Sequence, residues 1–284
     1  MRYDTPGTYT LDYTATDACG NTTTETRTIY VEGFNTTLFT DGTLIINEST
    51  LDRDANITAH GAVVEEYPPL DADNTYEFEN ANDQPWLIKR QQITTVEFGS
   101  AVTPTSMAYW FQDCKNLASI DFTNFDGSAV TTIRAEFSQT AITTIALPAM
   151  PNLTNLQYTF NRCYSLTDID FSNVGATGIE NMQDTFQSCY SLVAVSLVGL
   201  AGTIDKCERT FANTNNDGMG DMRIQTIYAD NNLKFWQATS STNMFRSCTS
   251  LVGGNGTVFR SDVTNKDYAR IDNLPDEPGY FTRG

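Results

Sequence analysis

A phenylalanine followed three residues later by a cysteine recurs along this chain of 284 residues. The clearest copies begin at Phe111, Phe160 and Phe186, and each leads into a short apolar segment. The centres of six such segments, spaced by 24, 25, 24, 26 and 32 residues, are Val96, Ile120, Ile145, Ile169, Val195 and Ile227. A nearly fixed period of this size predicts similar structural units that bury their apolar sides against one another. Such an architecture favours surface binding over catalysis.

Residues 1–33 differ from the rest of the chain. Two runs of alternating polar and apolar residues are separated by a turn, Asp17-Ala-Cys-Gly-Asn21, and this pattern predicts an antiparallel β-hairpin. The sequence from Pro6 to Asn21 closely resembles the last strands of bacterial immunoglobulin-like domains of cell-surface proteins. Because a lone hairpin is marginal in water, we expect residues 1–33 to pack on the following domain or to complete a sandwich with another chain.

The apolar segments predict short strands of the form apolar-x-x-apolar-x-apolar, at 93–98, 117–122, 142–147, 166–171, 192–197 and 224–228. The phenylalanines between them suit a short helix or turn. The predicted fold is a β-rich α/β solenoid, a leucine-rich-repeat stack of about six to seven coils, with a partial immunoglobulin-like β segment in front. We divide the chain into this β segment (1–33), an N-terminal β cap (34–85), the solenoid (86–252) and a C-terminal cap (253–284).

The N-terminal cap carries two local signals. Asp41-Gly42 lies between two apolar runs and predicts a strand–turn–strand unit. Residues 47–85 are rich in Asn, Asp and Glu, and a structureless connection of this length is unusual, so we expect short strands or a hairpin within it.

The repeats resemble BspA-type leucine-rich-repeat proteins of bacterial surfaces. The resemblance rests on the pattern Phe-x-x-Cys-x-x-Leu-x-x-Ile-Asp-Phe, the turn at 251–254 and the ending Pro-Gly-Tyr-Phe-Thr at 278–282, and it covers roughly residues 86–284. It implies a solenoid that acts as an adhesin or partner-binding protein, with no catalytic activity attached to the fold. The chain departs from the pattern at Thr140 and Thr214, which replace the repeat cysteine, and in the longer stretch after Phe211.

Charge and hydropathy restrict the partners. The formal net charge is −18, from 35 acidic and 17 basic residues without a basic cluster, which argues against nucleic acid and anionic membranes as partners. No apolar run reaches the roughly 18 residues of a membrane helix. The first residues also lack the apolar stretch of a secretory signal peptide, so we expect export to be arranged elsewhere in a longer protein or the chain to leave a cell within an assembled particle.

The cysteines and the single histidine carry little chemistry. Four of the six cysteines, Cys114, Cys163, Cys189 and Cys248, share one repeat position and are predicted to be buried thiols pointing the same way. With His60 as the only histidine, a zinc site or a nucleophile–histidine pair is not expected. We therefore expect no enzyme and no cofactor, with calcium as the one open possibility.

Calcium ligands are suggested only by the stretch after Phe211. Asn213, Asn215 and Asp217 followed by a glycine fit the start of a calcium-binding loop, and Asp221 lies nearby, but Ile224 occupies the position of the expected bidentate glutamate. An ordinary solvated turn explains the same residues.

The candidate binding residues are aromatic or acidic. Packing beneath the turns is the favoured interpretation of Tyr109, Trp110, Tyr164, Tyr190 and Trp236, and stacking on sugar rings is the alternative. Asp121 and Asp170 recur at one repeat position and face outward in the predicted strands, where they would serve either a binding surface or local hydrogen bonds. A carboxylate pair for glycan hydrolysis is the weaker interpretation.

The sequence therefore predicts a non-enzymatic binding or adhesion protein that recognises a protein or carbohydrate and lies outside the cell or on its surface. The alternative is a phage virion protein, as a capsid decoration or part of a fibre, that uses the same segments for assembly or host attachment. A hydrolase of surface glycans is the third class.

Overall fold

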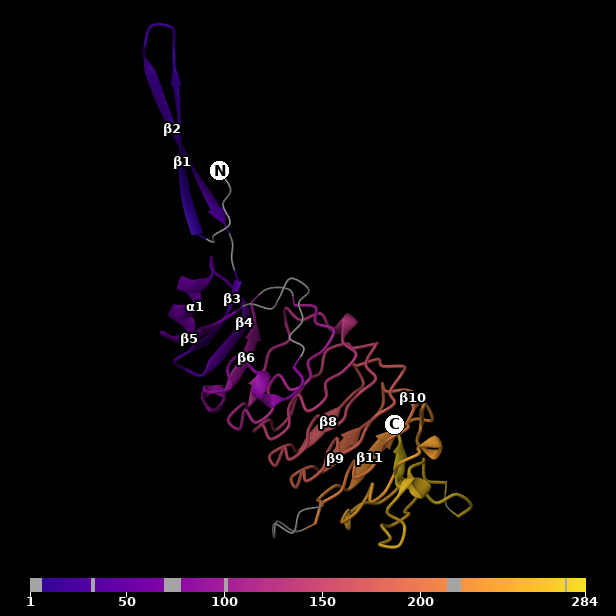
Figure 1. The fold of residues 1–284 in the computed structure, drawn as a ribbon. Helices are drawn as coiled ribbons and strands as arrows, with labels where there is room; N and C mark the ends of the chain where they lie inside the picture. Colours follow the sequence, from indigo (N-terminus) through magenta and orange to yellow (C-terminus); the bar gives the residue numbers. More distant parts are fainter. Residues whose placement is uncertain (1–6, 32–33, 69–77, 100–101, 214–220, 274) are drawn as a thin grey trace.

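The computed structural model describes residues 7–31, 34–68, 78–99, 102–213, 221–273 and 275–284. It begins with a hairpin of β1 (Gly7–Thr16) and β2 (Thr22–Val31), antiparallel along their whole length. The Asp17 carboxylate holds the turn, because it accepts hydrogen bonds from the amides of Cys19 and Asn21 at 2.8 and 2.9 Å. The predicted hairpin is confirmed. It extends away from the body of the protein (Figure 1), and among the described strands it has no third partner, so it does not pack on the following domain there.

A mixed five-stranded sheet follows, in the order β5-β3-β4-β6-β7. Its strands are β3 (Phe34–Phe39), β4 (Thr43–Ser49), β5 (Val63–Tyr67), β6 (Thr95–Phe98) and β7 (Ser119–Ile120). The strand–turn–strand unit at Asp41-Gly42 is confirmed by the antiparallel pairing of β3 with β4. Gly42 has φ of +91°, and a Cβ there would lie 2.7 Å from the Gln92 carbonyl oxygen, so this turn requires glycine.

Residues 47–85 contain an element that the sequence did not predict. Helix α1 (Arg53–His60) lies between β4 and β5, although only short strands were expected here. The helix has no buried residue and therefore no apolar stripe to reveal it. It is tied to the sheet by Arg53, whose Nε lies 3.0 Å from both carboxylate oxygens of the buried Glu48. Residues 69–77 of this stretch lie outside the described residues.

The second half of the chain carries two parallel sheets. One runs in the order β13-β11-β9-β8, and β10 pairs with β12 in the other. The strands are β8 (Asp168–Asp170), β9 (Ala194–Ser196), β10 (Gly202–Thr203), β11 (Thr226–Ala229), β12 (Leu233–Lys234) and β13 (Phe281–Arg283). The cap predicted at 253–284 thus shares a sheet with the middle of the chain through β13, which pairs with β11.

The predicted α/β solenoid is wrong. The described residues contain one α-helix, α1, which precedes the repeats, and the strands are divided among several small mixed and parallel sheets. The segment at 142–147, expected to be a strand, contributes only an isolated bridge between Ala146 and Asp170. The protein is β-rich, and the regular spacing of its sequence is built mainly with turns.

Turns around the phenylalanines form a ladder of backbone hydrogen bonds. The amides of Phe111, Phe137, Phe160 and Phe186 donate to carbonyl oxygens of the following segment at 3.2, 2.9, 2.9 and 2.8 Å. The residues two before and two after each of these phenylalanines have a left-handed backbone, as Asp184 and Ser188 do around Phe186, with φ of 57° and 61°. A non-glycine residue in this conformation costs about 1–2 kcal/mol. Because left-handed residues recur along each turn, every second backbone amide points toward the neighbouring segment. The hydrogen bonds that these amides form offset the conformational cost.

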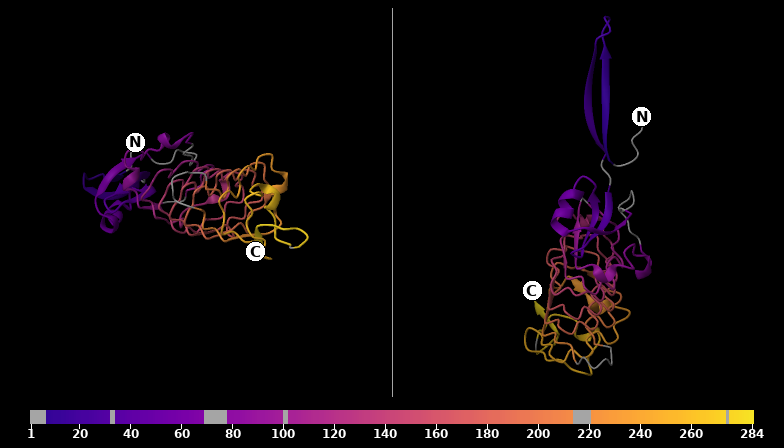
Figure 2. Two further views of the ribbon diagram at one scale, coloured as in Figure 1. Left: turned by 90° about the horizontal axis from the view of Figure 1, so that it is seen from below. Right: turned by 90° about the vertical axis from the view of Figure 1, so that its left-hand side faces the viewer.

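Rings and thiols fill the interior between these segments, which lie side by side along the body (Figure 2). The Phe186 ring stacks on Phe160 at 5.7 Å and on Phe211 at 5.6 Å. The thiol of Cys163 donates to the Phe137 carbonyl oxygen at 2.9 Å, and burial raises its pKa to about 11. Buried thiols are thus confirmed at the four repeat positions, whereas Cys19 in the hairpin turn is exposed.

Candidate functional site

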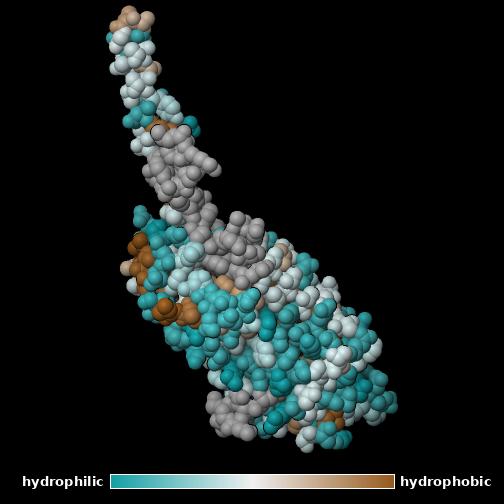
Figure 3. Space-filling view, viewed as in Figure 1, coloured by the Kyte–Doolittle hydropathy of each residue, from teal (hydrophilic) through white to brown (hydrophobic). Residues whose placement is uncertain are grey.

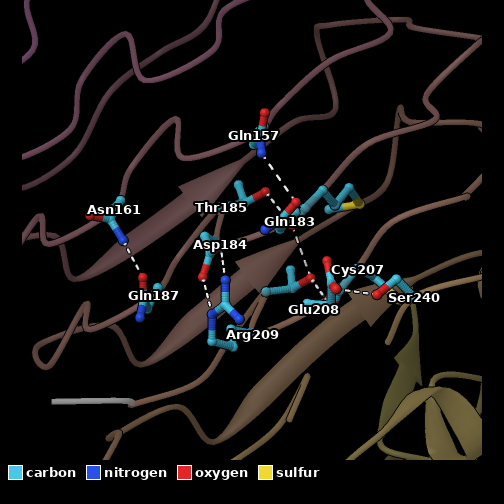
Figure 4. Close-up of polar contacts among 12 residues, drawn as sticks. Gln157, Asn161, Gln183, Asp184, Thr185, Gln187, Cys207, Glu208, Arg209 and Ser240 are labelled. Carbon is cyan, nitrogen blue, oxygen red and sulfur yellow. Dashed lines mark hydrogen bonds and ion pairs between the residues drawn. The ribbon is translucent and has the colours of Figure 1, made fainter. Parts of the chain in front are cut away.

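The left-handed turns place half-buried and buried side chains along one side of the segments, which we call the polar face: residues 108–109, 112–113, 134–135, 138–139, 157–158, 161–162, 183–184, 187–188, 208–209 and 212–213. Amides on neighbouring segments are paired across it. Gln157 donates to Gln183 at 3.1 Å, and Asn161 donates to Gln187 at 2.6 Å (Figure 4). The exposed surface seen in Figure 3 is likewise largely hydrophilic.

An ion pair stands beside these amides. Arg209 donates two hydrogen bonds of 2.6 Å to the two carboxylate oxygens of Asp184, which is fully buried (Figure 4). The hydrogen bond that Arg209 donates to Asp184 is the largest factor that raises the pKa of Arg209. Tyr158 adjoins it, and burial followed by the Asp184 charge raises the pKa of its hydroxyl. This part of the polar face is a fixed structural network.

A groove borders the polar face where isolated parallel bridges join Ser106 to Thr132 and Thr132 to Asn155. The groove has a volume of about 780 Å³. Its lining includes Thr131 and Thr154 as well as the three bridging residues, so hydroxyl and amide groups prevail. Two smaller hollows continue the groove. The first shares Asn155 with the groove, and the second shares Glu180 with the first. The groove therefore crosses several successive segments.

The aromatic residues predicted as binding candidates differ in how exposed they are in the structure. Trp110 is fully buried, so it is corrected from a surface candidate to a core residue that no sugar ring can reach. Tyr109, next to it, lines the groove. Tyr164 is 41% exposed and stacks at 5.6 Å on Tyr190, which is 7% exposed and donates to Asn213 at 3.1 Å.

Trp236 is the most accessible of these candidates. It is 68% exposed on the 3₁₀ turn Phe235–Gln237. It lines a hollow together with Lys266, Asp267 and Arg270, so the hollow has an exposed indole, two cations and one carboxylate in its lining. Lys266 is held in place there by the Ala238 carbonyl oxygen, which accepts from its ammonium group at 2.5 Å.

Asp121 and Asp170 have the same local role. Each accepts from the amide and hydroxyl of the residue two positions later, Thr123 at 2.9 and 2.5 Å and Ser172 at 2.9 Å in both cases. Partial burial acts to raise the pKa of Asp170, but the hydrogen bonds from Ser172 outweigh it, and the pKa lies below its ordinary value. Both carboxylates stabilise turns, and the lowered pKa of Asp170 does not suit a general acid.

The calcium candidates do not converge in the part of the chain that the structure describes. Asn213 is buried against Tyr190, whereas Asp221 is exposed and accepts from the Thr249 hydroxyl at 2.9 Å. Asn215 and Asp217 lie outside the described residues. Within the described residues no three His, Cys, Asp or Glu side chains gather as metal ligands would.

His60 is the last residue of helix α1, and its side chain contacts residues of the mixed sheet and its turn. Its Nδ1 lies 3.0 Å from an Asp41 carboxylate oxygen and its Nε2 lies 3.8 Å from Glu97. The interaction joins the helix end to the turn at Asp41-Gly42, which gives the histidine a structural role.

Sequence reasoning missed Arg134 and Arg162, which share a recess of the polar face with Tyr109 and Tyr158. The only sequence signal is their register relative to the phenylalanines. Tyr109 and Tyr158 each stand two residues before a phenylalanine, and Ala135 occupies the same position between them. That register becomes informative only when these positions are known to lie on the polar face.

Comparison with known proteins gives a match for one part of the chain. Residues 2–31 match the family model described as bacterial surface protein, Ig-like domain. No match was found among curated proteins or among solved structures. None of these comparisons supports the resemblance of residues 86–284 to BspA-type repeats. Helix α1, the one α-helix in the described residues, has 8 residues, and none of the helices there could span a membrane. The hairpin thus carries an immunoglobulin-like segment of a type found in bacterial surface proteins, which suggests a surface-associated role.

Proposed function

We propose that this chain is a non-enzymatic binding protein of a bacterial surface and that the groove beside the polar face holds a glycan. The single observation that carries the proposal is the continuity of the groove across successive segments, with hydroxyl and amide side chains along it and the charged side chains of Glu79, Arg134, Glu180, Asp205 and Lys206 among them. Sugar hydroxyls are donors and acceptors at once, and such side chains pair with them in either direction. A groove that crosses several segments also suits a ligand made of repeated units.

A protein partner is the alternative, and the polar face favours it less. Tight protein interfaces depend on aromatic and arginine anchors at the centre of a large patch. Here the largest exposed aromatic residue, Trp236, stands at a separate hollow. The groove has Phe78, Tyr109 and Arg134 in its lining, but most of its other lining residues are small and polar. Binding is favoured over hydrolysis because Asp121 and Asp170, the carboxylates considered for glycan hydrolysis, are engaged in their own turns.

Filling the groove tests this proposal. Thr131→Trp places a large side chain where an exposed threonine lines the groove, and we expect binding of the recognised glycan to weaken at least about 10-fold. The measurement is a glycan array with the full chain, followed by calorimetry on the glycan that binds best. Thr143→Trp is the matched control, because Thr143 is an exposed threonine that does not line the groove.

Two results would count against a glycan in the groove. One is a wild-type chain that retains no glycan on the array, and the other is a Thr131→Trp variant that binds as tightly as Thr143→Trp. Binding to a purified surface protein that Thr131→Trp abolishes would favour the protein partner instead.

A further inference from the structure

A recess of about 370 Å³ opens in the polar face between two tyrosines. Tyr109 and Tyr158 are half-buried and belong to segments that are next-nearest neighbours. The segment between them contributes Ala135 and Ser138, both small and buried, at positions where its neighbours carry larger side chains. The recess therefore exists because small side chains lie between two aromatic rings.

Two arginines line this recess without a carboxylate partner. The other half-buried arginines of the described residues each face an acid: Arg53 faces Glu48, Arg90 faces Asp113 and Arg209 faces Asp184. Arg134 and Arg162 are buried to a similar degree, and no described carboxylate pairs with either. The Nε atom of each is buried without a hydrogen-bond acceptor. In a chain with 35 acidic and 17 basic residues, two unpaired guanidinium groups in one recess are unexpected on charge alone.

The rest of the lining is neutral and polar. Gln112, Gln139, Asn161 and Gln187 surround the recess, and no carboxylate lines it. Asp184, which interacts with Tyr158 at the recess, already accepts two hydrogen bonds from Arg209. An anion in the recess would thus meet two positive charges and amide groups, and the carboxylate of Glu79 belongs to the adjoining groove and not to the recess lining.

Each part of the lining matches one part of an acidic sugar. The guanidinium fork fits a planar carboxylate, and such charge-assisted hydrogen bonds are about twice as strong as neutral ones. Tyrosine rings offer flat apolar faces for the C–H faces of a pyranose ring. The Arg134 guanidinium already lies 5.3 Å from the centre of the Tyr109 ring, so cation and ring are presented together.

We propose that this recess binds the ring and carboxylate of an acidic sugar residue, a uronic or a sialic acid, within the glycan that occupies the groove. The inference rests on the proposed function, because Tyr109 and Arg134 line both the groove and the recess. The groove would hold neutral sugar units, and the recess would select the carboxylate-bearing one.

Matched pairs of ligands test the proposal on the unmodified chain. The probes are tri-galacturonate with its methyl ester, and sialyllactose with lactose. We expect at least one acidic form to bind about 10-fold or more tightly than its neutral counterpart, measured by calorimetry at neutral pH. The pair that shows this preference identifies the source of the carboxylate.

Arginine variants place the preference in the recess. Arg134→Gln and Arg162→Gln should each weaken binding of the acidic form about 10-fold while changing binding of the neutral form little. Arg246→Gln is the matched control, since Arg246 is exposed and does not line the recess. Melting curves check that each variant folds, and the comparison of acid with neutral form on the wild-type chain stands without any variant.

The possible failures are distinguishable. If neutral glycans bind and Thr131→Trp blocks them, but acidic forms bind no more tightly, the groove stands and the recess proposal is overturned. Equal binding of the acidic form by wild type and by both arginine variants overturns it as well. If no probe and no array glycan binds, the proposed function fails and the recess proposal with it.

Discussion

Replacing Phe186 with alanine is expected to lower the free energy of unfolding by about 3–5 kcal/mol, the usual range for a buried phenylalanine. The Phe186 ring is fully buried and stacks on Phe160 and Phe211, with interplanar angles of 3° and 11°. Its edge also meets Phe171 at 6.2 Å. Removing it therefore takes away contacts on three sides at once.

The backbone prevents the resulting cavity from closing. The Phe186 amide donates to the Thr210 carbonyl oxygen at 2.8 Å, and Asp184 and Ser188 hold left-handed conformations on either side. A segment fixed in this way cannot relax into the space, and the loss is largest where a site cannot collapse. Urea denaturation followed by circular dichroism measures the change.

Tyr164→Ala is the control for this substitution, because Tyr164 is an aromatic residue that is 41% exposed. We expect it to lose clearly less stability than Phe186→Ala. A loss below about 1 kcal/mol for Phe186→Ala would contradict the view that the row of rings is a main source of stability.

The sequence predicted those parts of the fold that depend on local turn chemistry. The hairpin and the Asp41-Gly42 turn follow from alternation and from residues that tolerate a positive φ, and both are present. Helix α1 could not be predicted from an apolar stripe, since none of its residues is buried. Its contact with the sheet depends on the buried Arg53–Glu48 pair, which joins residues whose proximity is not visible in the sequence pattern.

The solenoid prediction failed because a regular sequence period shows which side chains recur but does not determine the backbone conformation of each repeat. The left-handed positions around each phenylalanine are filled by residues such as Tyr109, Ala135 and Arg162, where glycine or asparagine would have signalled them. Segments of this kind form hydrogen-bonded turns, and the expected strands shrink to two or three residues, as in β7 and β8.

The candidate site was predictable only in part, for a related reason. Tyr109 was chosen as an aromatic residue and does line the groove, whereas Trp110 beside it points into the core. Alternating backbone conformations send adjacent residues to opposite sides, and the sequence does not say which side each takes. The recess needs small residues between large ones on different segments, so it exists only after folding.

Replacing Glu136 with glutamine is expected to stabilise the protein, and the gain should grow with pH. Glu136 is fully buried, and neither of its carboxylate oxygens has a hydrogen-bond partner among the described residues. Burial raises its pKa well above the ordinary value of 4.5. The folded state therefore keeps the proton that the unfolded chain releases.

The sign of the effect follows from this difference. Below the unfolded pKa of about 4.5 both states are protonated, and Glu136 carries no ionisation penalty. As pH rises from there toward the folded pKa, the wild-type chain loses about 1.4 kcal/mol of stability per pH unit, whereas glutamine loses none at this site. Urea denaturation at pH 5 and pH 8 should show a larger gain at pH 8, with Glu180→Gln, at an exposed position, as the matched comparison. A gain that is equal at the two values, or a loss at pH 8, would mean that Glu136 has a partner that satisfies its charge.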